Sequence, residues 1–377
     1  MSVTAPGRPL VDLVVTESTG LSQFEALARE WNELVAASSD QIFLRHEFLL
    51  LWLQTFAAPS EIRILLGRDP GGRLVAALPL LETPDRVYGI PVRKLAATAN
   101  AHSCRFDLLA LDAARAADAF FAHLVADADW DVLRINELPA NGKGLELLRS
   151  AREAGLPAGL WESQRSPYLD LPGSSRELDR QLSGQLRSTV RRRRRQLAER
   201  GNLTFERFES GDLQAALDEC FLLERKSWKG EQGTAALQDR STKEFYYRLA
   251  ELALPHGWLS LYRLRLDGRT ISFQYGLTYG GTFNLLKLAY DQDLSRSSPG
   301  LVLQDDVVRD CLARGLARCD FLGGDELWKR RWSNGVLAHK WLFVYRDTVG
   351  GRLLHRAKFE WAPVVRRWLR RGADETA

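Results

Sequence analysis

Residues 258–332 decide the fold, and they read WLSLYRLRLDGRTISFQYGLTYGGTFNLLKLAYDQDLSRSSPGLVLQDDVVRDCLARGLARCDFLGGDELWKRRW. Three apolar runs predict consecutive strands at 258–266, 270–278 and 282–290. Tight-turn dipeptides join them, Asp267-Gly268 first and Gly280-Gly281 second. The stretch therefore begins as an antiparallel β-meander.

A helix over 300–314 follows this meander, and a short strand at 319–322 follows the helix. The helix opens on Ser297-Ser298-Pro299-Gly300. A helix N-terminus has unpaired N–H groups and partial positive charge, so it suits a phosphate. We expect Ser297, Ser298, Pro299, Gly300 and Leu301 to bind a phosphate-bearing acyl donor. The alternative is a well-made helix start, with Ser297 or Ser298 as cap and Pro299 in the first turn.

The composition is that of an ordinary globular protein. The chain has 377 residues, of which 45% are hydrophobic and 27% charged. This length allows about two to three domains. The net charge of +4 does not by itself favour nucleic acid or a membrane, so we expect neither DNA nor a membrane as partner.

Cysteines, histidines and the N-terminal residues suggest a soluble cytoplasmic protein. The four cysteines are scattered without a C-x-x-C pair, and none of the six histidines has metal-ligand spacing. We therefore expect no disulfide and no metal. The N-terminal residues show no secretory pattern, and the densest apolar stretch, 48–56, is too short to span a bilayer.

The order of elements suggests two copies of one unit, each with helices, antiparallel strands, a helix and a strand. The predicted fold class is α/β with mixed α+β sheets, in two tandem domains that each hold a mainly antiparallel sheet flanked by helices. We place the domains at 1–165 and 166–377, because SPYLDLPGSS at 166–175 follows Ser163 and is rich in turn formers. One large mixed domain is the alternative.

The second half resembles the GNAT acyltransferases, and more narrowly the double-GNAT subgroup called BioF2-like or CelD-like, which is related to the Fem peptidyltransferases. The similarity rests on the order and spacing of Trp228, Phe245, Gly268, Ile271, Tyr290-Asp291, Ser298-Pro299-Gly300, Gly315, Asp320-Phe321, Gly324-Asp325-Glu326, Lys329 and Trp332. In the first half, Phe43, Phe48, Trp52 and Ala77-Leu78-Pro79-Leu80 also fit. The resemblance covers nearly the whole chain and implies two GNAT-like domains, with the donor site in the second.

Three functions follow from this resemblance. The first is an N-acyltransferase that moves an acyl group from acyl-CoA, such as acetyl-CoA, to an amine or hydroxyl of a small or sugar-like acceptor between the two domains. The second is a Fem-like transferase that uses aminoacyl-tRNA. It draws on the basic run Arg191–Arg195 and on the lack of the glycine-rich pyrophosphate loop, which Ser297-Ser298-Pro299-Gly300 replaces. The third is a binding protein with a degenerate site.

Acyl transfer to an amine needs a proton acceptor, donors for the developing oxyanion and close positioning of the reactants. The resemblance implies that Lys329 polarises the transferred carbonyl or holds phosphate; a solvated charge run at 329–331 is the alternative. Asp291 is a candidate proton acceptor and Tyr290 a candidate proton donor. Glu224 is another candidate base, and Asp320 either orients Lys329 or starts a turn.

Four further residues are candidates for substrate binding. Trp228 follows a helix, and Trp328 stands where the family usually has tyrosine or phenylalanine before its lysine. Lys287 either points into the cleft or faces solvent, as a lysine on an alternating strand usually does. His102 either lines the groove between the domains or is structural.

The five consecutive arginines, Arg191 to Arg195, also allow two interpretations. A helix turns about 100° per residue, so five neighbours cannot all face one partner. We favour a solvated helix with acidic neighbours over a phosphate-tracking surface for tRNA.

Overall fold

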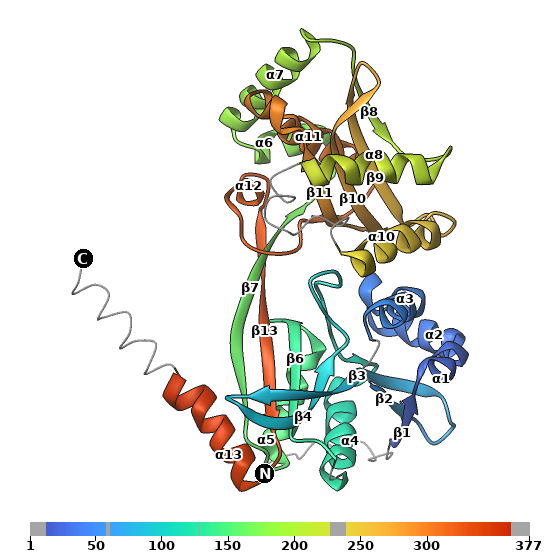
Figure 1. The fold of residues 1–377 in the computed structure, drawn as a ribbon, viewed down its shortest axis with the longest axis vertical. Coiled ribbons are helices and arrows are strands. Elements are labelled where there is room, and N and C mark those ends of the chain that lie inside the picture. The colour runs from blue at the N-terminus through green and yellow to red at the C-terminus, as the bar shows by residue number, and fades with distance from the viewer. Residues whose placement is uncertain (1–12, 58–60, 128, 227–238, 363–377) are drawn as a thin grey trace, which may run out of the picture.

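The computed structural model describes residues 13–57, 61–127, 129–226 and 239–362. It stacks two halves of the chain along the longest axis (Figure 1). Two long strands, β7 (Ala158–Asp170) and β13 (Gly335–Tyr345), pair antiparallel and run from one half into the other. This strand pair joins the two halves into one sheet.

The other strands are β1 (Val14–Thr19), β2 (Glu61–Arg68), β3 (Leu74–Val87), β4 (Ile90–Ala97), β5 (Leu109–Ala110), β6 (Val132–Pro139), β8 (Leu203–Arg207), β9 (Leu259–Leu266), β10 (Arg269–Tyr279), β11 (Thr282–Tyr290) and β12 (Arg318–Asp320). In the described part of the chain they form one 13-stranded sheet, ordered β1-β2-β3-β4-β6-β13-β7-β12-β11-β10-β9-β8. Strand β5 pairs with β3 beside this path.

The helices are α1 (Leu21–Ala26), α2 (Ala28–Ser38), α3 (His46–Phe56), α4 (Ala113–Ala126), α5 (Glu146–Glu153), α6 (Ser175–Gln181), α7 (Gly184–Ala198), α8 (Leu213–Lys226), α10 (Arg240–Ala253), α11 (Pro299–Ala313), α12 (Leu327–Arg330) and α13 (Val349–Arg356). Short helical turns are η1 (Ile42–Leu44), η2 (Lys143–Leu145), η4 (Gln292–Ser297) and η5 (Ala357–Trp361). Helix α13 lies at the lower end of the first half in Figure 1 and packs against β13.

The two halves repeat one plan, as the sequence predicts. The first half runs β1, three helices, β2 to β5, α4 and β6, and the second runs β8, α8 and α10, β9 to β11, α11 and β12. In each half the strand after the late helix pairs parallel with a strand that precedes the helix, β6 with β4 and β12 with β11. The other strand pairs are antiparallel. The mixed α/β fold with two similar units is thereby confirmed.

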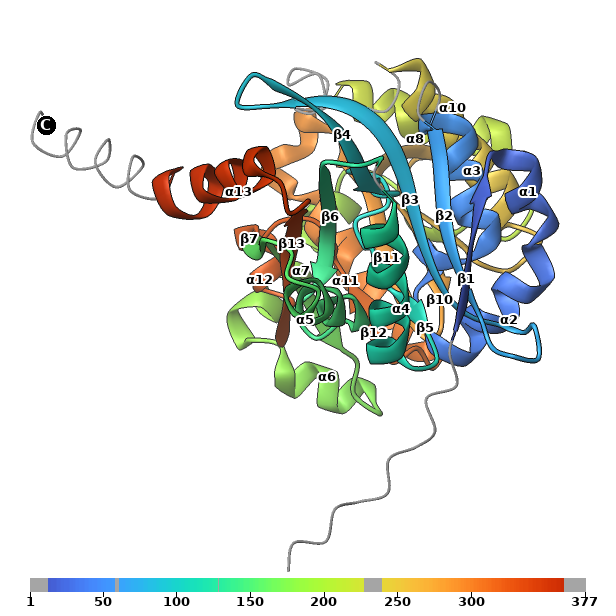
Figure 2. The same cartoon turned by 90° about the horizontal axis from the view of Figure 1, so that it is seen from below.

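Helices cover both faces of the sheet in each half. In the first half, α4 and α5 pack on one face, and they lie close together in the view from below (Figure 2). Helices α1 to α3 cover the opposite face. In the second half, α6, α7 and α11 share one core, whereas α8 and α10 pack on the other face. The core of α8 and α10 is continuous with that of α1 to α3, so one apolar core spans both halves.

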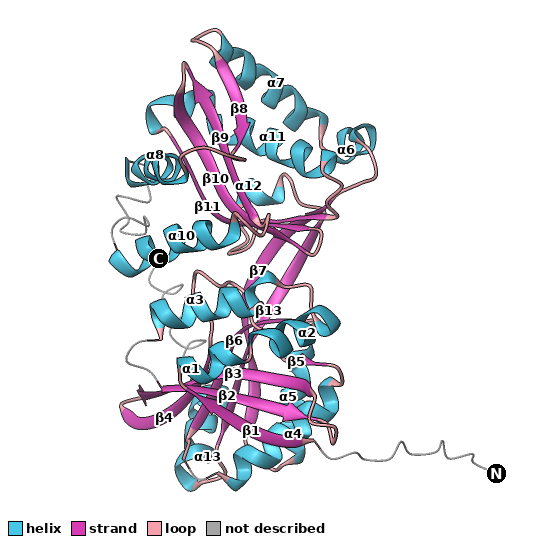
Figure 3. Cartoon of the chain, turned by 90° about the vertical axis from the view of Figure 1, so that its right-hand side faces the viewer, coloured by secondary structure: helices cyan, strands magenta, loops and turns pink. Residues whose placement is uncertain are grey.

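Helices α3 and α10 make the helical contact between the halves, and they face each other in Figure 3. The ring of Phe245 on α10 lies 5.8 Å from the ring of Phe48 and 5.0 Å from that of Phe56, measured between centroids. His102, from the loop after β4, stacks on Phe56 at 5.4 Å. Aromatic burial of this kind stabilises the junction beyond its area alone.

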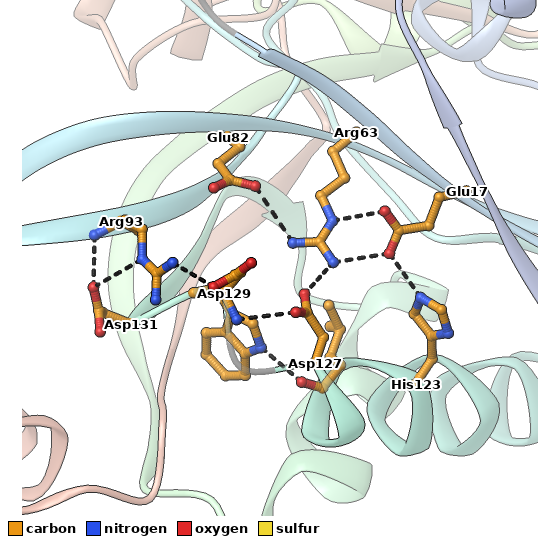
Figure 4. Close-up of polar contacts among 10 residues, drawn as sticks. Glu17, Arg63, Glu82, Arg93, His123, Asp127, Asp129 and Asp131 are labelled. Carbon is orange, nitrogen blue, oxygen red and sulfur yellow. Dashed lines mark hydrogen bonds and ion pairs between the residues drawn. The ribbon is translucent and has the colours of Figure 1, made fainter.

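An ion-pair network fastens the outer strands of the first half to α4 (Figure 4). Arg63 on β2 is buried and donates from Nη2 to Glu17 Oε1 at 2.8 Å and from Nε to Glu17 Oε2 at 3.0 Å. It also contacts Asp127 and Glu82. His123 on α4 contacts the same Glu17 oxygen at 2.7 Å. One buried guanidinium thus compensates three carboxylates.

Some local predictions are wrong for identifiable reasons. The first half of the turn-rich stretch, residues 166–170, is the end of strand β7, because β13 and β12 supply its hydrogen-bond partners. The boundary at 165/166 therefore falls inside a strand, and the division into two domains stays a prediction. The basic stretch around Arg191–Arg195 follows a break in the chain, because α6 and α7 are separated by extended backbone at Leu182 and α7 has its own cap at Ser183. Asp239 caps α10 by accepting from the Thr242 N–H.

Candidate active site

A cavity opens in the second half where two parallel strands separate. Strands β11 and β12 pair only from Thr282 to Asn284 and from Arg318 to Asp320, and β11 then continues to Tyr290 paired with β10 but without β12. The cavity has a volume of about 420 Å³. Its walls come from β10, β11, η4, the start of α11 and the segment after β12, and include Gln274, Leu288, Tyr290, Ser298, Gly300, Leu301, Gln304, Trp328, Arg331 and Trp332.

The predicted donor-binding turn lies at this cavity. Ser298 has a left-handed backbone with φ 50°, and Pro299 is the first residue of α11. The Ser298 hydroxyl donates back to the Ser295 carbonyl at 3.4 Å and does not cap α11. Within the described chain, no acceptor bonds the Gly300 N–H. Ser298, Gly300 and Leu301 line the cavity, whereas Ser297 and Pro299 are buried behind them.

Aromatic side chains narrow the cavity beside this turn. A Cβ built on Gly300 would lie 3.4 Å from Cδ1 of Tyr290, so the ring of Tyr290 packs against the first turn of α11. Trp328 also lines the cavity and donates its indole N–H to Glu326 at 2.5 Å. Tyr290 and Trp328, both predicted from the sequence, therefore lie at one cavity.

Asp291 is next to Tyr290 but does not line that cavity. Its carboxylate accepts from the Asp293 N–H at 3.1 Å and pairs with Arg269 at 2.8 Å. It caps the helical turn η4 and so fixes the approach to α11.

Lys329 is buried, with 5% of its surface exposed, so the alternative of a solvated charge run is wrong for this residue. Its ammonium donates to the carbonyls of Leu322 at 2.8 Å and Gly324 at 3.1 Å, and to Glu326 at 3.4 Å. Burial lowers the pKa of Lys329, although Glu326 opposes the change. The side chain therefore fastens the glycine-rich loop that follows β12.

Asp320 ends β12 at the point of divergence and pairs with the buried Arg105 of the first half. Its other oxygen accepts from the Leu322 N–H at 2.9 Å. Arg105 also contacts His339, and burial together with the charge of Arg105 lowers the pKa of His339 to about 4. Asp320 thus shapes the loop held by Lys329 without a direct hydrogen bond to the lysine.

Glu224, Lys287 and His102, three candidates from distant parts of the sequence, meet on the α8 and α10 side of β11. The Lys287 ammonium lies 3.7 Å from Glu224 Oε1 and 5.1 Å from the centre of the Tyr246 ring. His102 contacts the Tyr246 hydroxyl at 3.2 Å. Lys287 is 9% exposed, so the alternative that it faces solvent is wrong. Sequence reasoning missed Tyr246, because an aromatic residue on an apolar helix face carries no functional signal.

Burial, assisted by the charge of Lys287, lowers the pKa of His102 to about 4. Its imidazole is therefore neutral at pH 7 and has a lone pair for a proton. Glu224 has none of its surface exposed. Trp228 lies outside the described residues.

A second cavity, of about 260 Å³, lies between the two halves. Its polar walls include Asp40, Arg105, Asp107, Asn284, Arg318 and Asp320. Asn284 and Asp320 are also the last paired residues of β11 and β12. The cavity between the halves therefore reaches the base of the strand divergence.

Three of the five consecutive arginines on α7 bond to other side chains of the protein. Arg194 pairs with Asp306 at 2.6 Å, Arg195 with Glu199 at 3.7 Å, and Arg193 donates to Gln196 at 3.0 Å. Arg191 and Arg192 are exposed. In the described part of the chain, no group of three or more His, Cys, Asp or Glu side chains is arranged to hold a metal, and none of the helices is long and apolar enough to cross a bilayer.

Comparison with known proteins agrees with this geometry. Residues 184–330 match the acetyltransferase (GNAT) domain family. The chain carries a GNAT acetyltransferase domain. The matched region contains β9 to β12, α11 and the whole 420 Å³ cavity except Arg331 and Trp332. The protein is thus an acyltransferase of the GNAT type. A search of curated protein sequences finds no match.

Solved structures share the fold of nearly the whole chain. FemX is 14% identical with a TM-score of 0.58, and the match covers 83% of this chain and 95% of FemX. The C-terminal domain of a putative lysylphosphatidylglycerol synthetase from Agrobacterium fabrum is 13% identical with a TM-score of 0.53, over 88% of this chain and 95% of that domain. L-PGS from Bacillus licheniformis is 11% identical with a TM-score of 0.52, over 87% of this chain and 95% of that one. The GNAT enzyme therefore has the Fem-like double-unit fold.

Proposed function

We propose that this GNAT enzyme transfers an acyl group from acyl-CoA to an amine or hydroxyl of a small acceptor bound between the two halves. The observation that carries the proposal is the cavity at the strand divergence, which the first turn of α11 lines with Ser298, Gly300 and Leu301. The partial positive charge of this helix end favours a diphosphate. Gly300 supports the role because it adds no side chain between the backbone and the ligand.

The extended arm of the donor would lie along β11. Gly276 of β10 pairs with Leu285, and Tyr275 pairs with Lys287, so Leu286 is an extra residue in β11. Such a bulge interrupts the ladder and leaves backbone groups free for other partners. Acyl-CoA supplies an activated carbonyl, and the backbone of the bulge is our candidate for binding that oxygen.

The acceptor would enter from the polar cavity between the halves. Arg105, Asn284 and Asp320 offer hydrogen-bond donors and acceptors there, and Asn284 and Asp320 lie at the base of the divergence. An amine must lose a proton before or during attack. Glu224 and the neutral His102 are the candidate proton acceptors, and Lys287 sets the charge around them.

The experiment is a comparison of donors. Acetyl-CoA and CoA should raise the melting temperature of the purified protein, because they bind the folded state. Aminoacyl-tRNA is the competing donor, and the exposed Arg191 and Arg192 together with the fold shared with FemX are the observations in its favour. Stabilisation by charged tRNA with steep salt dependence, and none by CoA, would replace our donor with that one. No response to either would indicate a binding protein.

A further inference from the structure

Two buried glutamines line the 420 Å³ cavity at the start of α11, which is the proposed donor cavity. Gln274 on β10 is 3% exposed and Gln304 on α11 is 1% exposed. Gln274 Nε2 donates to Gln304 Oε1 at 3.0 Å. Gln274 Oε1 and Gln304 Nε2 bond no group in the described chain.

Leaving these two atoms without partners is unfavourable, because a buried polar group without a hydrogen bond destabilises the folded state. Turning both amides over would exchange the free atoms, but one donor and one acceptor would still remain. The pair therefore leaves one amide NH₂ group and one amide oxygen without partners in two residues that line the cavity. The surrounding walls are mostly apolar and include Phe273, Leu288 and Trp332.

We propose that the Gln274–Gln304 pair binds an amide of the donor's phosphopantetheine arm and selects donors that carry one. This inference rests on the proposed function, in which the phosphates lie at the first turn of α11. Gln304 lies about one helical turn beyond Gly300 along α11, and Gln274 pairs with Leu288, which also lines the cavity. An amide carbonyl accepts from Gln304 Nε2, and an amide N–H donates to Gln274 Oε1.

The adenine ring of CoA also has a hydrogen-bond donor beside an acceptor, and glutamine side chains bind adenine through both in nucleic acids. We favour the amide, because the pair lies between the helix end that suits phosphate and the base of the strand divergence. The adenine alternative places the terminal nucleoside at the pair. Two fragments of CoA distinguish these assignments. 4′-Phosphopantetheine has the phosphate and both amides, whereas adenosine 3′,5′-diphosphate has the nucleotide without an amide.

The test is calorimetric titration of CoA and both fragments into the wild type and two variants, Gln304→Met and the double variant Gln274→Leu/Gln304→Met. Gln185→Met, at an exposed position on α7, is the matched control. Each lost hydrogen bond should weaken CoA and 4′-phosphopantetheine about tenfold and leave adenosine 3′,5′-diphosphate unchanged. The double variant should melt no lower than the wild type without ligand, because it removes the unpartnered atoms together.

Three results would overturn the inference. Unchanged CoA affinity in both variants would show that the pair has no part in binding, while the proposed function would stand. Weakened binding of adenosine 3′,5′-diphosphate alone would assign the pair to the base. Absence of CoA binding to the wild type would remove the proposed donor, and the inference with it.

Discussion

The ammonium nitrogen of Lys287 lies 3.7 Å from the carboxylate of Glu224, and the two residues come from β11 and α8. His102 of the first half reaches the same cluster through the Tyr246 hydroxyl. The pairing places a buried carboxylate beside the strand along which the donor would lie. The cluster of Glu224, Lys287, Tyr246 and His102 therefore combines residues from both halves of the chain.

Glu224→Gln should therefore lower kcat by about a hundredfold at saturating acetyl-CoA, because removal of a general base typically has an effect of this size. The affinity for CoA should not change, since Glu224 does not line the donor cavity. Steady-state kinetics with calorimetry for CoA checks this. Glu244→Gln, at an exposed site on α10, is the control. Full turnover in Glu224→Gln would exclude Glu224 as the base.

Lys329→Met should lower the melting temperature and the turnover together. The substitution removes the donor that three acceptors share, and two of these are carbonyls of the loop after β12. Leaving buried acceptors unsatisfied destabilises by about 1–3 kcal/mol. Thermal unfolding and kinetics provide the measurement, with the exposed Arg330→Met as control. A large loss of turnover at an unchanged melting temperature would instead favour direct contact between Lys329 and the substrate.

Arg63→Gln should destabilise the first half by roughly 3 kcal/mol, because it leaves Glu17, Glu82 and Asp127 close together without their shared cation (Figure 4). Urea unfolding at pH 7 measures the change. The control is Arg29→Gln, whose exposed pair with Glu33 should contribute less than about 1 kcal/mol. If both substitutions lowered the free energy of unfolding equally, burial of Arg63 would not explain its contribution to stability.

His339 should make stability fall in mild acid. Its pKa is about 4 in the folded protein and 6.5 in the unfolded reference. Between these values the unfolded chain binds more protons, so the free energy of unfolding decreases as pH falls from 6.5 towards 4. By pH 4 the loss from this group is roughly 3 kcal/mol. The slope should be smaller in His339→Gln than in the wild type when urea unfolding is repeated across this range. Identical slopes of unfolding free energy against pH in the two proteins would contradict a lowered pKa of His339.

The sequence predicts the elements whose signals are local. Strand β11 matches its predicted range of 282–290, and α11 begins at Pro299, because Gly280-Gly281 and Ser298-Pro299 determine these ends by backbone geometry. Strand β7 was missed, because Pro167 and its polar neighbours resemble a linker and the strand forms only against β13, whose paired residues lie far along the chain. Tertiary pairing here overrides local propensity.

In the candidate site, too, local features could be predicted from the sequence and long-range contacts could not. The turn at Ser298 to Leu301 could be predicted, since a helix N-terminus is visible in the sequence. The meeting of His102 with Tyr246 and Lys287 could not, because it depends on the packing of one half against the other. Gln274 and Gln304 also gave no signal, because a polar residue on an alternating strand or helix usually faces solvent.

The affinity of acetyl-CoA for Gly300→Val, relative to the wild type, tests the account's central claim most directly. The valine Cβ would meet the Tyr290 ring at 3.4 Å, and its methyl groups would crowd the first turn of α11. Gly350→Val, at an exposed position on α13 with no close neighbour, is the control. We predict saturable binding to the wild type and the control, and at least about a tenfold loss in Gly300→Val without loss of folding. Equal affinities in all three proteins would contradict a donor site at the start of α11.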